Sequence, residues 1–449
     1  MNNIGHNSHG PQVEACDALH AQKYRLPNES FTEACARQAG AMSDNEEHRL
    51  VFKDILLNQR YMPAGRVQAA MGSPKNVTAY NCFVSGVIED SMDSIMDKAK
   101  EAAETMRRGG GIGFDFSRIR PRNDRIVSLD SSASGPVSFM AIFDSVCNTI
   151  VSAGHRRGAM MSVLRVDHPD IEEFIRAKKD SSTLTNFNVS VGVTDQFMKA
   201  VQHNLPFDLI FNGTVYDTID ARALWDEIMR NNWDWAEPGV LFLDRINEEN
   251  NLHYVETIEA TNPCGEQPLP PYGACLLGSF NLVKYVDRAN QHKDYYSFNY
   301  QQFKEDIPHV VRAMDNVIDR TQYPLASQLR EAKAKRRMGL GITGLANVLT
   351  LLGVKYGSPE AVRFTRKISK TLMCSTYEAS ALLAKEKGVF PEYKPEYNLS
   401  KFIQRLPLDI RELIQKHGIR NSHLTSIAPT GTISFTADNI SSGVEPVFS

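Results

Sequence analysis

The feature that most constrains this chain is an alternation of short β-rich runs with amphipathic helical runs. We predict strands at 80–88, 112–119, 186–193, 207–211 and 240–243, and helices at 91–108, 136–152, 225–235 and 359–387. Such alternation favours an α/β architecture with a substantial parallel component. With 449 residues, the chain is long enough to bury a large core.

Other segments are less regular. Residues 1–40 form a polar lead-in, and 41–75 read as an N-terminal helical region. There, Ser43 and Glu46 predict a capping box that starts a helix. Residues 339–352 are apolar, rich in small residues and part of a more helical second half, whereas 426–434 read as a strand followed by a phosphate-type turn.

Charge and hydropathy exclude several classes of protein. Fifty basic and 53 acidic residues leave a net charge of −3, which gives no electrostatic footprint for nucleic acid or an anionic membrane. No apolar run approaches the roughly 18 residues of a membrane span. The first ten residues lack the basic start and apolar stretch of a signal peptide. We therefore expect a cytoplasmic protein.

The seven cysteines point away from a disulfide scaffold, because their number is odd and their spacing wide. No Cys-x-x-Cys pair is present, so the sequence predicts no metal site. In a reducing compartment, each cysteine is either a small buried hydrophobe or a chemical tool.

The segment Asn262–Glu266 is the most informative one. Pro263 and Gly265 bracket Cys264 in a tight turn, typical of a fingertip loop. Glu266 can serve as an acid or base beside the thiol, and the Asn262 amide can donate and accept. The alternative is a plain turn in which the cysteine fills a hole and the glutamate is solvated.

The wider pattern resembles a known family. Residues 262–269, continuing to 273–279, closely resemble the active-site signature of ribonucleotide reductases, and the Pro-Cys-Gly-Glu form is most similar to class II, the adenosylcobalamin-dependent branch. The resemblance runs from about residue 61 to 449 and includes motifs at 81–84, 109–113, 156–158, 337–341 and 428–432. It implies the family's ten-stranded α/β barrel over 76–449, with Cys264 on a finger loop inside it.

The resemblance also implies separate jobs for three cysteines. Cys264 would carry the thiyl radical that removes the 3′ hydrogen of a ribonucleotide, taken here to be a diphosphate. Cys82 and Cys275 would form the dithiol that supplies two electrons, restored by a thioredoxin-like reductant. Glu266 would take the 3′ hydroxyl proton, and Asn262 would hold the sugar.

Binding a substrate diphosphate requires hydrogen-bond donors that leave room for its phosphate groups. The turn at 429–433 offers backbone N–H groups and two hydroxyls but no lysine, so it is not a Walker loop; an ordinary β-turn is the alternative. The glycine run at 109–113 follows a helix, which argues against a dinucleotide fingerprint. The substrate-binding residues implied by the resemblance are Asn81, Gly111, Pro429, Thr430, Gly431, Thr432 and Ile433.

In the family, an effector nucleotide, a deoxynucleotide or ATP, binds at the interface of a homodimer and selects the base that is reduced. The matching residues here are Asp90, Ser91, Met92, Arg107, Arg120, Arg156 and Arg157. For Arg107 and Arg120, the alternative is solvated surface charge. The segment 152–158 matches the loop that couples the two sites.

Two departures from the family pattern are expected to matter. The lead-in is unlike the ATP-cone of many relatives, and the chain stops before the last barrel strands, so a second polypeptide would complete the barrel.

Two rival functions remain: the large subunit of a class I reductase, which needs a radical-generating partner protein, and a non-catalytic nucleotide-binding fragment.

Overall fold

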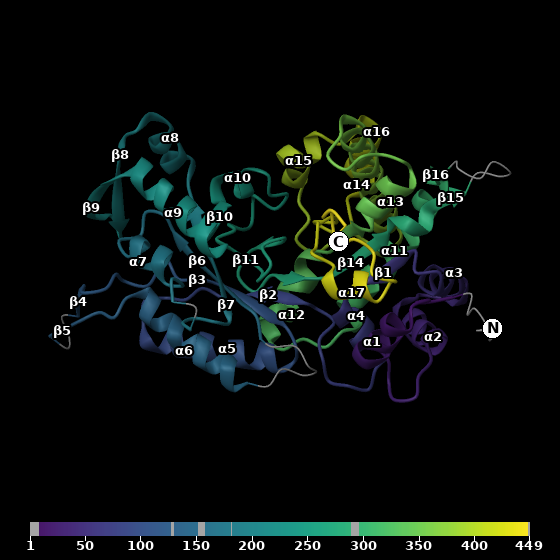
Figure 1. Cartoon of the computed structure of the whole chain (residues 1–449), viewed down its shortest axis with the longest axis horizontal. Helices are drawn as coiled ribbons and strands as arrows, with labels where there is room; N and C mark the ends of the chain where they lie inside the picture. The colour runs from purple at the N-terminus through teal and green to yellow at the C-terminus, as the bar shows by residue number, and fades with distance from the viewer. Residues whose placement is uncertain (1–8, 127–129, 151–157, 181, 289–295, 448–449) are drawn as a thin grey trace. The chain divides into compact units, whose positions relative to one another are not determined.

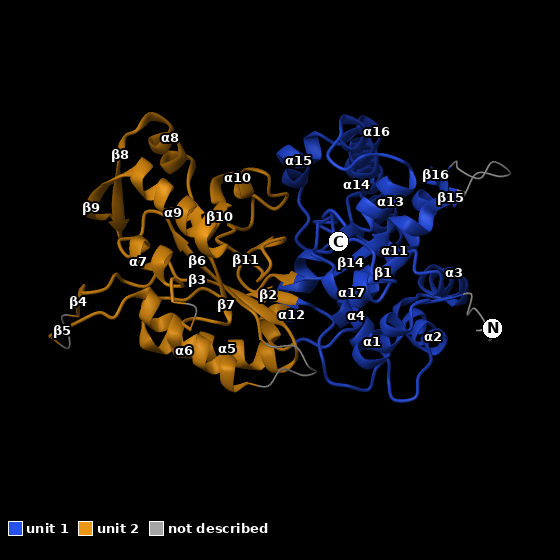
Figure 2. Ribbon diagram, viewed as in Figure 1, with its two compact units in different colours: residues 1–81, 275–323, 329–449 blue, residues 82–274, 324–328 orange. Residues whose placement is uncertain are grey.

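The computed structural model describes residues 9–126, 130–150, 158–180, 182–288 and 296–447. The chain divides into two compact units (Figure 2). Unit 1 contains residues 1–81, 275–323 and 329–449, and unit 2 contains residues 82–274 and 324–328.

Unit 2 is built on a sheet whose strand order is β10 (Gly239–Phe242), β7 (Phe187–Val193), β6 (Met160–Arg165), β3 (Gly111–Asp115), β2 (Cys82–Val84) and β13 (Ala274–Cys275). The pairs from β10 to β2 are all parallel. The last strand, β13, runs across the boundary into unit 1. The α/β architecture with a parallel component, predicted from the alternation, is thus confirmed (Figure 1).

Helices cover this sheet because their apolar stripes need a partner. They are α5 (Met92–Arg107), α6 (Pro136–Thr149), α7 (Ile171–Arg176), α8 (Asp195–His203), α9 (Ala221–Trp235) and α10 (Leu243–Glu248). The core beneath them is mainly aliphatic but contains packed phenylalanines: the ring centroids of Phe114 and Phe143 lie 4.8 Å apart. Three hairpins complete the unit: β4 (Arg125–Ile126) with β5 (Ser131–Ser132), β8 (Pro206–Phe211) with β9 (Thr214–Asp220), and β11 (Ala260–Thr261) with β12 (Pro268–Leu269).

Unit 1 has a smaller sheet of β1 (Tyr61–Pro63), β14 (Leu277–Asn281) and β17 (Gly339–Thr343). β17 lies parallel to β14, and β1 is antiparallel to it. A single parallel bridge joins Leu340 to Thr425 beyond the sheet edge. Another hairpin pairs β15 (Val286–Arg288) with β16 (Tyr296–Phe298).

Unit 1 is otherwise helical. Its elements are α1 (Glu14–Tyr24), α2 (Phe31–Met42), α3 (Glu46–Leu57), α4 (Gly65–Ala70), η1 (Leu282–Tyr285), α11 (Tyr300–Arg320), α12 (Ala326–Lys335, which begins in unit 2), α13 (Leu345–Leu351), α14 (Pro359–Lys387), η2 (Pro395–Leu399), α15 (Lys401–Gln404), α16 (Leu408–His417) and α17 (Gly431–Phe435). A buried carboxylate, Asp315, fixes several of them together, since it accepts hydrogen bonds from Arg336, Arg420 and Asn421.

Three local predictions are corrected. α3 is capped by Asn45, whose side chain accepts from the His48 N–H, because α2 extends to Met42 and uses Ser43 as its own C-cap. The apolar stretch 339–352 is not one helix but β17 followed by α13. The strand expected at 426–434 is reduced to the bridge at Thr425, and the short helix α17 follows.

Among the residues that the structure describes, no helix is both long and apolar enough to cross a membrane.

Candidate functional site

The predicted finger loop lies in unit 2, between β11 and β12, where it forms a tight turn. The Gly265 N–H donates to the Asn262 carbonyl at 3.0 Å, and Gly265 takes a φ of +80°, which glycine adopts without strain. Cys264 is exposed at the tip, whereas Asn262 and Pro263 are buried. The sequence therefore places one thiol outside an otherwise buried stem.

Asn262 holds this loop together with both ends of its amide. Its Nδ2 donates to Glu266 Oε2 at 2.6 Å, and its Oδ1 accepts from the Gln267 N–H at 2.9 Å. A fully buried amide needs such partners, since a buried polar atom without one costs about 1–3 kcal/mol. Asn262 therefore orients the Glu266 carboxylate two residues beyond the thiol; its predicted contact with the sugar stays a prediction.

Glycines bring the loop onto the sheet. A Cβ added to Gly113 would lie 1.9 Å from the Thr261 carbonyl oxygen, so the stem of the loop packs directly on the β3 backbone. A Cβ added to Gly111 would lie 3.0 Å from Pro263 Cγ and 3.4 Å from Cys82 Sγ. The loop that carries Cys264 and the thiol of Cys82 therefore meet at Gly111.

Strands β2 and β7 contribute further residues near the base of this loop. Cys82 pairs with Gly111 in the parallel register of β2 and β3, and its side chain is buried. From β7, Asn188 Nδ2 donates to the Pro263 carbonyl at 2.6 Å. Asn188 and Gly113 were not among the predicted site residues. Asn188 stands out only as a polar residue in an apolar strand, and Gly113 only as part of the glycine run.

The third cysteine of the prediction, Cys275, is fully buried in unit 1. Just before it, residues 272–273 run antiparallel to residues 84–85, since the Val84 N–H donates to the Gly273 carbonyl at 2.9 Å and the Tyr272 N–H to the Ser85 carbonyl at 3.4 Å. Whether the Cys275 sulfur faces that of Cys82 stays a prediction.

The predicted phosphate turn lies in unit 1. Thr430 is buried with a φ of +52°, an uncommon conformation for a β-branched residue, and its hydroxyl is fully engaged. It accepts from the Gly443 N–H at 2.7 Å and lies 3.0 Å from Thr343 Oγ1, which itself donates to the Ser441 carbonyl. Thr430 therefore shapes the turn rather than presenting a free hydroxyl.

The rest of the turn faces solvent. Pro429, Gly431 and Thr432 are exposed, whereas Ile433 is buried. In the same unit, Asn81 Oδ1 is buried without a hydrogen-bond partner. A buried acceptor of this kind fits a ligand donor, because native structures rarely leave such atoms unpaired.

Most of the predicted effector residues that the structure describes lie at the start of α5, and Arg107 lies at its end. Ser91 caps the helix, its side chain accepting from the Ser94 N–H, and Met92 is exposed. Asp90 accepts from the Arg120 backbone N–H at 3.1 Å and from its Nε at 2.7 Å. Arg107 is exposed in the last turn of α5, so these residues span its whole length. Arg156 and Arg157 lie outside the described residues.

A cavity of about 490 Å³ opens beside Asp90 in unit 2. Its lining includes Arg118, Arg165 and His168, together with the tip of the β8–β9 hairpin at Ile210 to Asn212. It lies past the carboxyl ends of β3 and β6, where ligands of parallel sheets bind.

Close to this cavity, β3 ends in a partly buried acid, Asp115. Burial raises the pKa of Asp115 to about 6, and the negative charge of Glu259 raises it further, while hydrogen bonds from Ser117 act in the opposite sense. Arg118 pairs with both Glu259 and Glu89 at 3.4 Å. Asp115, Arg118 and Glu259 were not among the predicted site residues.

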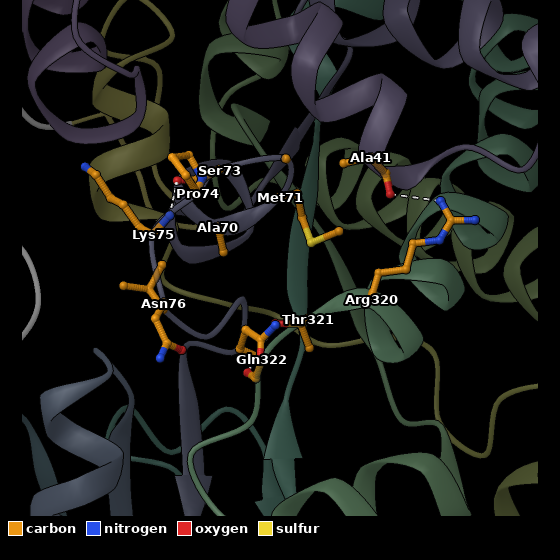
Figure 3. Close-up of a pocket in the computed structure, with 12 residues that line it drawn as sticks. Ala41, Ala70, Met71, Ser73, Pro74, Lys75, Asn76, Arg320, Thr321 and Gln322 are labelled. Atoms are coloured by element: carbon orange, nitrogen blue, oxygen red, sulfur yellow. Dashed lines mark hydrogen bonds between the residues drawn. The ribbon is translucent and has the colours of Figure 1, made fainter.

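A second cavity, about 360 Å³, lies in unit 1 among residues 70–77 and 320–322. Figure 3 shows Arg320 turned toward the Ala41 carbonyl, to which its Nη1 donates at 2.8 Å. None of the predicted site residues lines this cavity.

The comparisons with known proteins agree with one another. Residues 80–449 match the family model described as ribonucleotide reductase, barrel domain. The chain is 41% identical to the vitamin B12-dependent ribonucleoside-diphosphate reductase of Thermoplasma acidophilum, over 82% of the chain and 45% of that protein. It is 40% identical to the protein of the same name from Mycobacterium tuberculosis strain CDC 1551, over 88% and 54%. A vitamin B12-dependent ribonucleotide reductase of Streptomyces coelicolor is 32% identical over 89% and 46%. The chain spans about half the length of these relatives.

Proposed function

Because the chain belongs to the ribonucleotide reductase family, as its match over residues 80–449 shows, we propose that it reduces ribonucleotides to 2′-deoxyribonucleotides with adenosylcobalamin as the radical source. Two of the relatives are named as B12-dependent reductases of ribonucleoside diphosphates, which makes a diphosphate the expected substrate. The observation that carries the proposal is the meeting of Cys82 with the stem of the Cys264 loop at Gly111.

One feature of the described residues fits adenosylcobalamin, namely the exposure of Cys264. Cys264 is exposed while its neighbours Asn262 and Pro263 are buried, so a large group can approach the sulfur without unfolding the stem. When bound, adenosylcobalamin supplies the radical chemistry that oxidises this thiol by one electron.

The chain's own residues do the rest. The Cys264 sulfur takes the 3′ hydrogen atom of the ribose, which requires the two atoms to be held in contact. Glu266, oriented by Asn262 at 2.6 Å, takes the 3′ hydroxyl proton, and the 2′ hydroxyl leaves as water. Cys82 and Cys275 supply two electrons and two protons: one proton leaves with the 2′ hydroxyl as water, the other ends on C2′, and the two sulfurs close a disulfide. Glu266 gives its proton back to the 3′ oxygen, and Cys264 returns the hydrogen atom to C3′. A thioredoxin-like dithiol then reduces the disulfide by exchange.

Gly431 and Thr432, the two exposed residues of the turn at 429–433 that carry an N–H, bind the substrate phosphates, and the buried Asn81 oxygen accepts from the substrate. Thiol chemistry of this kind suits a reducing compartment, so a cytoplasmic location is part of the proposal.

The effector nucleotide binds along α5, from Asp90 to Arg107. An apolar groove of about 620 Å³ between α5 and α6, lined by Ala103, Ile142, Val146 and Ile150, receives the same helices of a second copy. Burying such a face against itself is how a two-fold dimer forms. Arg120→Ala should weaken effector binding about fivefold in equilibrium dialysis, because Arg120 and Asp90 then no longer fix the start of α5. An unchanged affinity would place the effector elsewhere.

The experiment that tests the function is a reduction assay with a ribonucleoside diphosphate, a dithiol and adenosylcobalamin, together with any polypeptide that completes the barrel. We expect 2′-deoxy product, and a Cys82–Cys275 disulfide after one turnover without reductant. Turnover only with a radical-generating protein partner would indicate class I. Effector binding without product under every condition would indicate a non-catalytic fragment.

A further inference from the structure

We propose that Tyr272 is a positioning residue, which fixes the chain leading into Cys275 against β2 by means of a clamp to helix α5. The inference rests on the proposed function, in which Cys275 is one of two reducing thiols. Tyr272, α5 and β2 all belong to unit 2.

The first observation is an unfavourable backbone. The Gly273 N–H donates to the Pro270 carbonyl at 2.9 Å, so residues 270–273 form a β-turn. Tyr272, the third residue of that turn, has a φ of +63°. Turns with a positive φ at this place favour glycine or asparagine, and a bulky residue there is an outlier. A strained residue persists only where its surroundings over-determine it.

The second observation is what holds the side chain. Lys98 Nζ donates to the Tyr272 hydroxyl at 2.6 Å and lies 5.1 Å from the centroid of its ring. The hydroxyl donates to Glu101 Oε1 at 3.4 Å, and Lys98 also pairs with Glu101 at 2.9 Å. Burial lowers the pKa of Lys98, but the hydrogen bonds to Tyr272 and Glu101 outweigh it, and the pKa is raised. The ammonium of the clamp therefore stays charged at neutral pH.

The third observation concerns Gly86. A Cβ added there would lie 2.3 Å from both Cζ and the hydroxyl oxygen of Tyr272, so the phenol end lies directly against the backbone that follows β2. The main chain is fixed as well: the Tyr272 N–H donates to the Ser85 carbonyl at 3.4 Å, and the Val84 N–H to the Gly273 carbonyl at 2.9 Å. Side chain and backbone together hold this turn against β2.

The consequence follows from the chain direction. Cys275 follows Gly273 by two residues, so the clamp fixes the chain that leads directly into this thiol. The two thiols can close a disulfide only within a narrow range of separations. The clamp therefore governs the delivery of electrons and not the abstraction of hydrogen by Cys264. Because it is built on α5, it also ties the reducing thiols to the helix at which the effector binds.

Two variants of Tyr272 test this role in the complete enzyme. Tyr272→Phe keeps the ring and the turn but removes both hydroxyl contacts; we expect about tenfold slower steady-state turnover, with 3′-tritium release in a single turnover within twofold of wild type. Tyr272→Gly suits the backbone better but removes the clamp altogether, and we expect an even larger loss of turnover. Lys98→Met should resemble Tyr272→Phe, whereas Lys199→Met, which changes an exposed lysine of α8, should not.

A readout independent of activity is the alkylation rate of Cys275, followed by mass spectrometry. Cys275 is fully buried, and we expect its alkylation to become at least fivefold faster in Tyr272→Phe and Lys98→Met. Wild-type turnover and wild-type alkylation in Tyr272→Gly would overturn the proposal, as would a parallel loss of tritium release. If the wild-type enzyme makes no deoxynucleotide and releases no tritium, the proposed function fails, while the alkylation rates still decide whether the clamp exists.

Discussion

The finger loop of unit 2 and the phosphate turn of unit 1 solve the same structural problem in opposite ways. Each reverses the chain through a positive φ. The loop places glycine there, at Gly265, whereas the turn places a threonine, Thr430, and holds it by its own hydroxyl. In the loop, buried Asn262 supplies the hydrogen bonds and the side chain of Cys264 is left outside.

The difference shows what each region presents to a ligand. The loop offers a thiol side chain on a backbone in which the N–H groups of Asn262, Gly265 and Gln267 are already paired. The turn uses its buried hydroxyl for structure and leaves exposed backbone at Gly431 and Thr432. We infer that the first region performs chemistry and the second binds phosphate, and the following predictions test that division.

The largest effect is expected from Cys264→Ser. A hydroxyl does not form the radical that a thiol forms, so product should fall to background while the loop, held by Asn262, keeps its shape. Deoxynucleotide formation is measured against Cys374→Ser, which changes a partly exposed cysteine of α14. Substantial product from Cys264→Ser would remove the chemistry from this loop.

Next is Gly113→Ala. The added methyl would lie 1.9 Å from the Thr261 oxygen, so the stem of the loop must move. We expect about 100-fold lower kcat and a loss of about 2–3 kcal/mol in the free energy of unfolding, as overpacking causes. Kinetics and denaturant unfolding measure the two. Gly40→Ala, with open space around its Cβ on a helix, serves as the control and should be neutral or stabilising.

Thr430→Val should act on binding instead. It removes the hydrogen bonds to Gly443 and Thr343 but leaves the loop in unit 2 unchanged. We expect KM for the ribonucleotide to rise about tenfold with kcat within twofold, and Thr430→Ser to recover most of the loss. A fall in kcat at constant KM would mean that the turn takes part in the chemistry.

Part of the fold could be predicted from the sequence. α5 and α14 were predicted within one or two residues, because each has a periodic apolar stripe and clear end signals, Ser91 before α5 and Gly388 after α14. The wrong N-cap at Ser43 arose because Ser43 and Asn45 both suit a cap, and only the length of α2 decides between them. The run 339–352 misled because a fully buried strand has no polar alternation to distinguish it from a buried helix.

The site was predictable in part. The turn-forming residues around Cys264 predicted an exposed loop tip, and Cys264 is exposed in the structure. Sequence could not show that Thr430 uses its hydroxyl internally, since Gly443 and Thr343 are distant in the chain. Nor could it show that Gly113 contacts Thr261, because close backbone approach leaves no pattern except the glycine itself.

The smallest expected effect is on the pH dependence of stability. It involves Asp115 at the end of β3, the strand on which the stem of the Cys264 loop packs. Burial raises the pKa of Asp115 to about 6, above its value in the unfolded chain, so the folded protein prefers the protonated acid. Its contribution to stability is greatest below about pH 4 and is lost as the pH rises through 6. Asp115→Asn should therefore raise the free energy of unfolding by about 1–2 kcal/mol at pH 7.5 and flatten its decline between pH 4 and 7.

Unfolding by denaturant at several pH values measures this effect. Asp180→Asn is the control, because its exposed carboxyl has a pKa lowered by Ser182 and changes stability in the opposite sense. Equal pH profiles for wild type and Asp115→Asn would contradict the assignment.

The most direct test of the account is 3′-tritium release from labelled ribonucleotide by Cys82→Ser. Cys82 and the stem of the Cys264 loop meet at Gly111, yet we expect Cys264 alone to abstract the hydrogen. Cys82→Ser should release tritium at a rate close to wild type while forming no normal deoxynucleotide. Loss of tritium release in this variant would contradict the division of labour between the two thiols.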